Sequence, residues 1–174
     1  MKIKTMLLCS LFAALSAILS QAAVPVGPVP VTLTHVSVFM AAGLLGARRG
    51  ALSQIVYVVL GAAGAPVFAG MTGGIAKISG PTGGFIIGYI ACAFVSGFIM
   101  EKAPKEKSRG ALIPALAMSV GMIFTYAPGV LWFMGVTGAA AAAALSACVL
   151  PFLPGDALKI ALCIFLLNRV KINN

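Results

Sequence analysis

The chain has 174 residues, of which 61% are hydrophobic and 9% are charged. Soluble domains carry about 25% charged residues, and a soluble fold of this length buries only about 70% of the surface that its unfolded chain exposes, so the composition excludes an ordinary soluble domain. The formal net charge is +9, but the basic residues form short clusters between long apolar runs. This distribution is typical of a membrane protein and argues against nucleic-acid binding. The length allows a single domain over residues 1–174.

Six apolar segments have the length of transmembrane helices, which need about 20 residues, or somewhat fewer inside a bundle. In chain order they are Thr5–Ala23, Leu33–Ala47, Ala51–Pro66, Gly83–Met100, Ala111–Tyr126 and Asp156–Val170. The Ala-rich stretch Gly138–Leu150 predicts a further short helix before the last span. The predicted fold is therefore an all-α integral membrane protein with six transmembrane helices.

The basic residues predict the orientation of these spans. If both termini are cytoplasmic, ten of the twelve Lys and Arg residues fall on the cytoplasmic side, as the positive-inside rule requires. The ten are Lys2, Lys4, Arg48, Arg49, Lys102, Lys105, Lys107, Arg109, Arg169 and Lys171. Only Lys77 and Lys159 are left for the external side.

The first span has two interpretations. Its basic start, apolar run and small residues near the end resemble a secretory signal peptide. Ala13 and Ala17, however, form a small-xxx-small pair on one helix face, which favours a retained helix that packs closely against another. We predict retention and keep the signal peptide as the alternative.

The three predicted external connections are rich in Pro and Gly. They read VPVGPVPVT, PVFAGMTGGIAKISGPTGG and PFLPGD. The prolines of the first prevent a continuous helix and favour an extended segment. Irregular backbone at membrane depth is tolerated only where protein buries it or where it lines a cavity. Their convergence on one face predicts a ligand pocket capped by external loops.

Asp156 is the only Asp in the chain, and Lys159 follows three residues later. On a helix these two side chains share a face. Ionisable groups at the edge of a membrane span are costly and tend to mark function. Asp156 also suits the N-cap of the last helix, but a cap does not need a lysine one turn further on. We predict that both residues bind a ligand.

The fourth span carries small residues at every fourth position, which predicts a ridge for close helix packing. They are Gly84, Gly88, Cys92 and Ser96. Gly84 also follows Thr82 closely, where glycine backbone lets a bound molecule approach. Phe68 and Tyr89 are aromatic candidates for the pocket wall. The sequence thus adds Thr82, Gly84, Phe68 and Tyr89 to the candidate ligand contacts.

Other chemistry has little support in the sequence. The P-loop pattern GxxxxGK[ST] does not occur, so we expect no ATPase site in this chain. We predict no catalytic residues and no metal site, because paired carboxylates, metal-ligand clusters and a nucleophile with a base are not found. His35 stands alone and is interpreted as a packing residue. The four cysteines are isolated in apolar stretches and are interpreted likewise.

Four motifs together resemble the BioY family of biotin transporters. They are VPVGPVPVTLTHVSVFMAAGLLGARRGALSQIVYVVLGAAGAPVFAG, GPTGGFIIGY, PGVLWF and PFLPGDALK, and they extend from about Val24 to Lys159. Many relatives have Gln where this chain has Thr34, before His35.

The resemblance implies a substrate-binding (S) component of an energy-coupling-factor (ECF) transporter in a bacterial or archaeal cytoplasmic membrane. Such a subunit binds biotin and associates with a transmembrane coupling (T) component and two ATPases, which bind the ATP; it uses no cofactor of its own. The resemblance implies that Asp156 and Lys159 contact biotin and that Ala13 and Ala17 face the T component. The alternatives are an S-component for another small vitamin, a non-transport membrane scaffold and an undetected enzyme.

Overall fold

The structure, a computed structural model, describes residues 3–104 and 110–170. Six helices correspond to the six predicted spans: α1 (Ile3–Gln21), α2 (Thr34–Leu45), α3 (Ala47–Ala62), α5 (Gly83–Lys102), α7 (Leu112–Thr137) and α9 (Leu153–Arg169). The predicted short helix is α8 (Ala141–Cys148). The all-helical class is confirmed. Of the ten basic residues predicted to be cytoplasmic, Lys2, Lys105, Lys107, Arg109 and Lys171 lie outside the described residues.

Several helices have the length and the apolar composition of membrane-spanning helices. Within the described ranges, α1, α5 and α7 are each long and apolar enough to cross a bilayer, and α8 with α9 qualifies as a fourth span bent by 47°. Helix α2 is apolar but has only 12 residues. The count of six spans therefore stays a prediction.

Two helix boundaries differ from the sequence-based prediction. Helix α7 does not end at Tyr126 but continues through Pro128 to Thr137. A proline removes one backbone hydrogen bond without ending a membrane helix whose neighbours still pack against it. Helix α9 begins at Leu153, with proline in its first turn, where the missing N–H is not needed.

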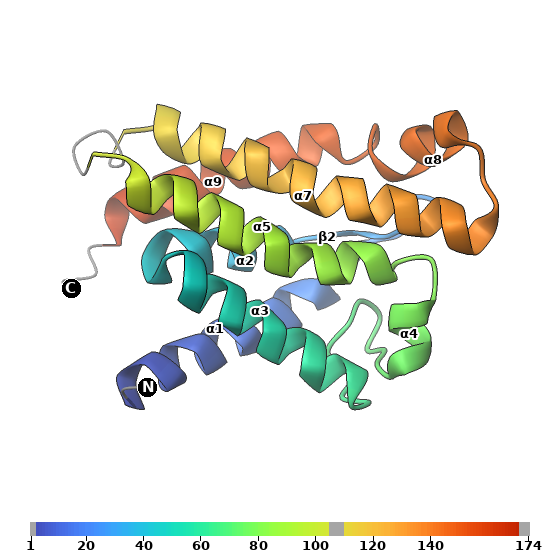
Figure 1. The fold of residues 1–174 in the computed structure, drawn as a ribbon, viewed down its shortest axis with the longest axis horizontal. Coiled ribbons are helices and arrows are strands. Elements are labelled where there is room, and N and C mark those ends of the chain that lie inside the picture. The colour runs from blue at the N-terminus through green and yellow to red at the C-terminus, as the bar shows by residue number, and fades with distance from the viewer. Residues whose placement is uncertain (1–2, 105–109, 171–174) are drawn as a thin grey trace.

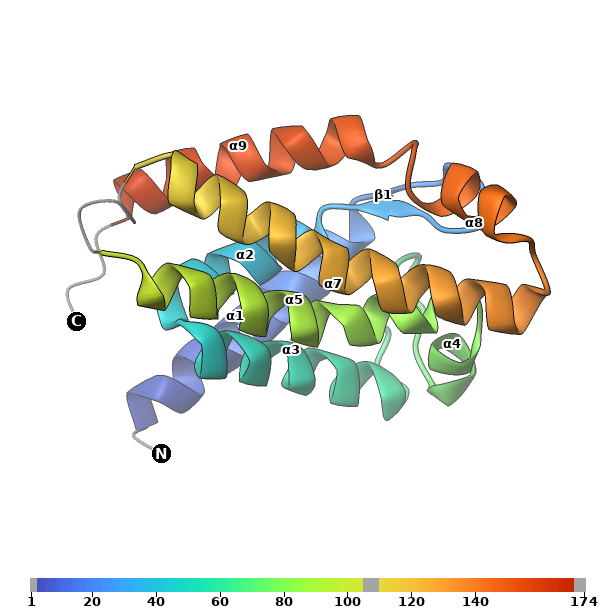
Figure 2. The ribbon, with the colours of Figure 1, turned by 45° about the horizontal axis from the view of Figure 1, so that its top comes forward.

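The three Pro- and Gly-rich connections lie together at one end of the bundle. The Pro-rich segment forms a hairpin of β1 (Ala23–Val24) and β2 (Val31–Thr32), so the predicted extended conformation is confirmed. The Gly-rich connection holds a short helix, α4 (Ile75–Ser79), that the sequence did not predict. Figures 1 and 2 show α4, α8 and the hairpin at the end opposite to the start of α1 and the end of α9.

The small-residue ridge packs α5 against α7, as predicted. A Cβ on Gly84 would collide with Trp132 and the Pro128 carbonyl, and a Cβ on Gly88 would press on the backbone of Thr125. Ser96 donates a hydrogen bond to the Ala117 carbonyl at 3.1 Å. Small side chains let the two helix backbones approach each other closely.

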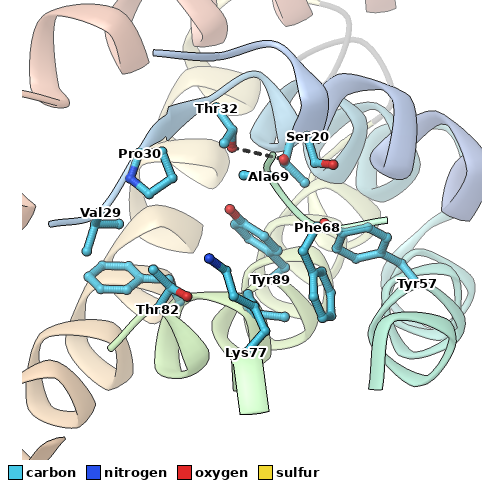
Figure 3. Close-up of a pocket in the computed structure, with 13 residues that line it drawn as sticks. Ser20, Val29, Pro30, Thr32, Tyr57, Phe68, Ala69, Lys77, Thr82 and Tyr89 are labelled. Carbon is cyan, nitrogen blue, oxygen red and sulfur yellow. Dashed lines mark hydrogen bonds between the residues drawn. The ribbon is translucent and has the colours of Figure 1, made fainter. Parts of the chain in front are cut away.

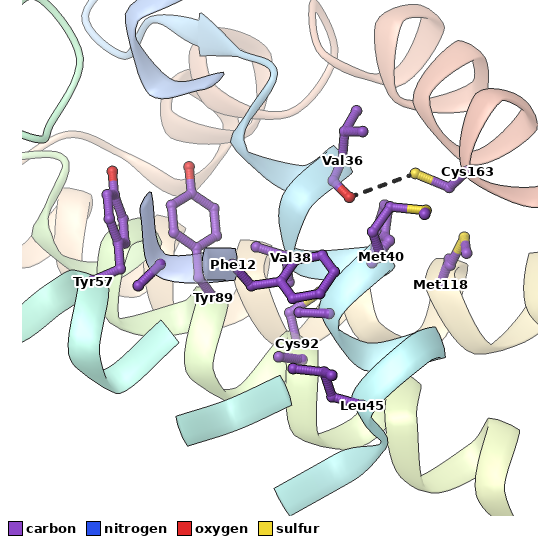
Figure 4. Close-up of a cluster of buried hydrophobic side chains, with 14 of the residues drawn as sticks. Phe12, Val36, Val38, Met40, Leu45, Tyr57, Tyr89, Cys92, Met118 and Cys163 are labelled. Carbon is purple, nitrogen blue, oxygen red and sulfur yellow. Dashed lines mark hydrogen bonds between the residues drawn. The ribbon is translucent and has the colours of Figure 1, made fainter. Parts of the chain in front are cut away.

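Buried side chains join the remaining helices to this pair. Figure 4 shows the largest apolar cluster, in which the Cys163 thiol of α9 reaches the Val36 carbonyl of α2 at 3.7 Å. A cluster of three polar side chains links α1, α2 and α3. Ser16 Oγ lies 2.9 Å from Ser37 Oγ and 3.2 Å from Gln54 Oε1. All three are fully buried.

Helix α1 therefore packs as part of the bundle, and its retention stays a prediction. The predicted partner surface on α1 needs correction. Ala13 is 2% exposed and packs inside the chain's own core, and Ala17 is partly buried against it. The small face of α1 is used against α2 and α3. The exposed small residues of this helix are Ser10 and Ala14.

Candidate functional site

Two adjoining cavities lie where the three irregular connections meet. Their volumes are about 40 and 30 Å³, room for about two water molecules each. Both are lined by Val29, Pro30, Thr32, Phe85 and Tyr89. The hairpin thus covers both cavities, and Tyr89 stands between them.

The cavity of about 30 Å³, which we name the ion-pair cavity, is lined by Asp156 and Lys159. Lys159 Nζ lies 2.8 Å from Asp156 Oδ1, and both residues are at most 5% exposed. The prediction that the two side chains share one helix face is confirmed. Tyr126 of α7 donates a hydrogen bond to Asp156 Oδ2. The carboxylate is therefore held between two helices.

The N-cap interpretation of Asp156 is wrong. Helix α9 begins three residues earlier, and Phe152 occupies the cap position. The Asp156 side chain makes no capping bond, because it turns instead toward Tyr126 and Lys159.

His35 also lines the ion-pair cavity, from the first turn of α2. Its ring packs edge-on against Tyr89, with the centroids 5.0 Å apart. Nε2 is buried and has no hydrogen-bond partner among the described residues. A buried polar atom without a partner is uncommon and calls for an explanation. The ring of His35 therefore packs as the sequence predicted, but packing does not account for Nε2.

The cavity of about 40 Å³, which we name the Lys77 cavity, is lined by one cation and several hydroxyl groups. Figure 3 shows the amino end of Lys77 pointing into the group of lining side chains, between Thr82 and Tyr89. The hydroxyl-bearing lining residues are Ser20, Thr32, Thr34, Tyr57, Thr82 and Tyr89. Neither Asp156 nor Glu101, the two carboxylates among the described residues, lines this cavity.

Phe68 forms part of the apolar wall of the Lys77 cavity and is 1% exposed. Its ring packs edge-on against Tyr57 at 5.5 Å and lies over Gly61, where a Cβ would have no room.

The backbone around Phe68 is tied to the end of α1. Gln21 Nε2 donates to the Phe68 carbonyl at 3.1 Å, and the Met71 amide donates to Gln21 Oε1 at 2.8 Å. Ser20 Oγ reaches the Val67 carbonyl at 2.6 Å. Helix α1 therefore fixes the position of one cavity wall.

The predicted site residues fall into two groups. Thr82, Phe68 and Tyr89 line the Lys77 cavity, and Tyr89 also lines the ion-pair cavity beside Asp156 and Lys159. Gly84 lines neither cavity, because its surface is covered by Trp132 of α7. Its role is helix packing, and the expected ligand contact at Gly84 is not supported.

Sequence reasoning did not select His35, Tyr126 or Lys77 as site residues. For Lys77 a signal was present, since it and Lys159 are the two basic residues left on the side of the irregular connections. His35 and Tyr126 gave no comparable signal, because their neighbours in the site are distant in sequence.

Comparison with known proteins identifies relatives over nearly the full length. The model of the BioY family matches residues 1–173. The probable biotin transporter BioY of Pyrococcus horikoshii is 38% identical over 99% of both chains. The biotin transporter BioY of Thermotoga maritima is 37% identical over 92% of both chains.

A solved structure matches the fold. It is the crystal structure of the S-component for biotin from an ECF-type ABC transporter, with a TM-score of 0.87, 30% sequence identity, and coverage of 96% of this chain and 90% of that chain. The relatives are transporters rather than enzymes. The matches cover nearly the whole chain, and the chain belongs to the BioY family.

Proposed function

We propose that this protein is the biotin-binding membrane subunit of a high-affinity uptake system that works with an ECF energy-coupling module. The relatives named above are biotin transporters, and the matching crystal structure is a biotin S-component. The observation that carries the proposal is the buried Asp156–Lys159 pair beside the unpartnered His35 nitrogen.

These groups complement the ureido ring of biotin. A ureido group offers two N–H donors and one carbonyl acceptor. The Asp156 carboxylate accepts hydrogen bonds only, while the Lys159 ammonium donates them. His35 Nε2 supplies a further polar contact. Phe85, Phe152 and the hairpin give the apolar walls that a fused ring requires.

Ligand entry requires movement of the covering segments. Cavities of about 40 and 30 Å³ are far below the roughly 300 Å³ of a ligand-sized pocket. The hairpin and the α3–α4 connection are the segments that cover them, so we propose that these two segments separate to admit biotin.

The proposed orientation has six membrane-crossing helices, cytoplasmic termini and external cavities. The start of α1 and the end of α9 lie at one end of the bundle, with the exposed Arg48, Arg49 and Lys102 as cytoplasmic cations. In this orientation the cavities face the external side, from which the vitamin enters. The membrane is the cytoplasmic membrane of a bacterium or archaeon.

We further propose that the chain docks on a T component joined to two ATPases. The exposed small residues Ser10 and Ala14 of α1 allow close approach of a partner helix, and Ala13 does not reach this surface.

Ligand binding tests the proposed function directly. The purified chain is titrated with biotin by calorimetry, and then with thiamine and riboflavin under the same conditions. We expect saturable binding of biotin at about one molecule per chain and no binding of the other two. Saturable binding of another vitamin alone would assign a different S-component. Folded protein that binds none of them would leave a scaffold, and turnover of biotin would indicate an enzyme.

A further inference from the structure

Lys77 is a cation with no anionic partner in the described part of the chain. It lies on α4, its side chain is partly buried, and it makes no ion pair there. The two described carboxylates are engaged elsewhere, since Asp156 binds Lys159 and Tyr126, and Glu101 accepts a hydrogen bond from the Ala47 amide.

The side chain nevertheless points inward. Lys77 lines its cavity together with Thr82 and Tyr89, and Figure 3 shows the ammonium between these two residues. A lysine whose only role was solubility would extend into solvent, where its charge is best hydrated.

The two cavities differ in whether their lysine already has an anionic partner. In the ion-pair cavity Lys159 Nζ is engaged by Asp156 at 2.8 Å, whereas Lys77 has no carboxylate beside it among the described residues. A ligand carboxylate in the ion-pair cavity would have to compete with Asp156 for Lys159, while the same group beside Lys77 would gain a charge-assisted hydrogen bond.

We propose that Lys77 is the counter-ion for the carboxylate of the bound ligand. This inference rests on the proposed function, and it assigns a direction to biotin: the ureido ring lies in the ion-pair cavity, and the valerate chain passes Tyr89 so that its carboxylate meets Lys77. Thr82 adds a hydroxyl contact to the same carboxylate. The Lys77 cavity is thus a subsite for carboxylates, which separates biotin from neutral derivatives.

A comparison of biotin with biotinamide tests this assignment, because the amide keeps the ring and chain but has no charge. Both are titrated into the full-length wild-type protein and into Lys77→Met, Lys77→Arg and Lys102→Met. The Lys102 variant removes an exposed lysine at the far end of α5 and serves as the matched control.

We expect the wild-type protein to prefer biotin to biotinamide about tenfold, the order of one charge-assisted contact at a partly exposed site. Lys77→Met should lose this preference by weakening biotin binding while leaving biotinamide affinity unchanged. Lys77→Arg and Lys102→Met should retain it. Biotinamide binding by Lys77→Met also shows that the variant is folded.

Two results would overturn the assignment. A wild-type protein that binds both ligands equally has no carboxylate subsite, and a Lys77→Met variant that keeps the full preference places the carboxylate elsewhere. Both results are distinct from failure of the proposed function, in which folded wild-type protein would bind neither ligand.

Discussion

Asp156 and Lys159 form an ion pair one helical turn apart, with side chains only 4% and 6% exposed. Removing two charges from water costs more than their attraction usually returns, so a buried pair contributes little net stability. The pair lines a cavity wall, where a ligand group can reach it, which is consistent with a pair kept for binding. This distinction leads to the first prediction.

Single and double substitutions of the pair should separate stability from binding. Asp156→Asn and Lys159→Met each leave one buried charge without its partner and should lower the free energy of unfolding by about 3–5 kcal/mol. The combined variant should recover much of that stability, yet its biotin affinity should stay at least tenfold weaker. Thermal unfolding and calorimetric titration measure the two effects. Recovery of both properties together would make the pair purely structural.

His35 should be needed for affinity and not for folding. His35→Phe keeps a ring against Tyr89 and removes the unpartnered Nε2, so the thermal midpoint should stay level or rise. Biotin binding should weaken about tenfold, since a ligand group loses its partner. His35→Gln should retain more affinity than the Phe variant. If His35→Phe binds biotin normally, Nε2 makes no ligand contact.

Two neighbouring alanines on α1 should behave differently. Ala13→Leu adds volume to a packed core and should destabilise the chain by about 1–3 kcal/mol. Ala14→Leu lies on the exposed face and should leave stability and biotin binding unchanged. It should reduce co-purification with the T component and biotin uptake by cells. Normal co-purification of the Ala14 variant would place the docking surface on another helix.

Gln21 should control how tightly the α3–α4 connection closes over the cavity. Gln21→Leu removes the hydrogen bonds to Phe68 and Met71, so amide exchange across residues 67–72 should speed up about tenfold. Dissociation of biotin should accelerate as well. Ser79→Ala, which removes only a bond within α4, is the control. Unchanged exchange would show that the Ser20 hydrogen bond and the packing of Phe68 hold the connection without Gln21.

The sequence alone determined the membrane class, the helical fold and the approximate position of each helix except α4. Hydrophobic length and the positions of Pro and Gly carry that information locally, because a helix satisfies its own backbone hydrogen bonds. The same holds for the α5 ridge, whose period of four places Gly84, Gly88 and Ser96 on one face. The Asp156–Lys159 pair was likewise predictable, since both residues lie on one helix turn.

The tertiary structure decided which side chains meet across helices. His35, Tyr126 and Asp156 come from α2, α7 and α9, and Lys77 from a short helix within a Gly-rich connection. Periodicity gives the face of each helix but not its partner, which is why Ala13 was assigned to a docking surface when it belongs to the core. The environment of Asp156 also depended on packing. Because α9 begins at Leu153, Asp156 does not take the alternative role of N-cap, and its carboxylate lies in a cavity wall beside Lys159.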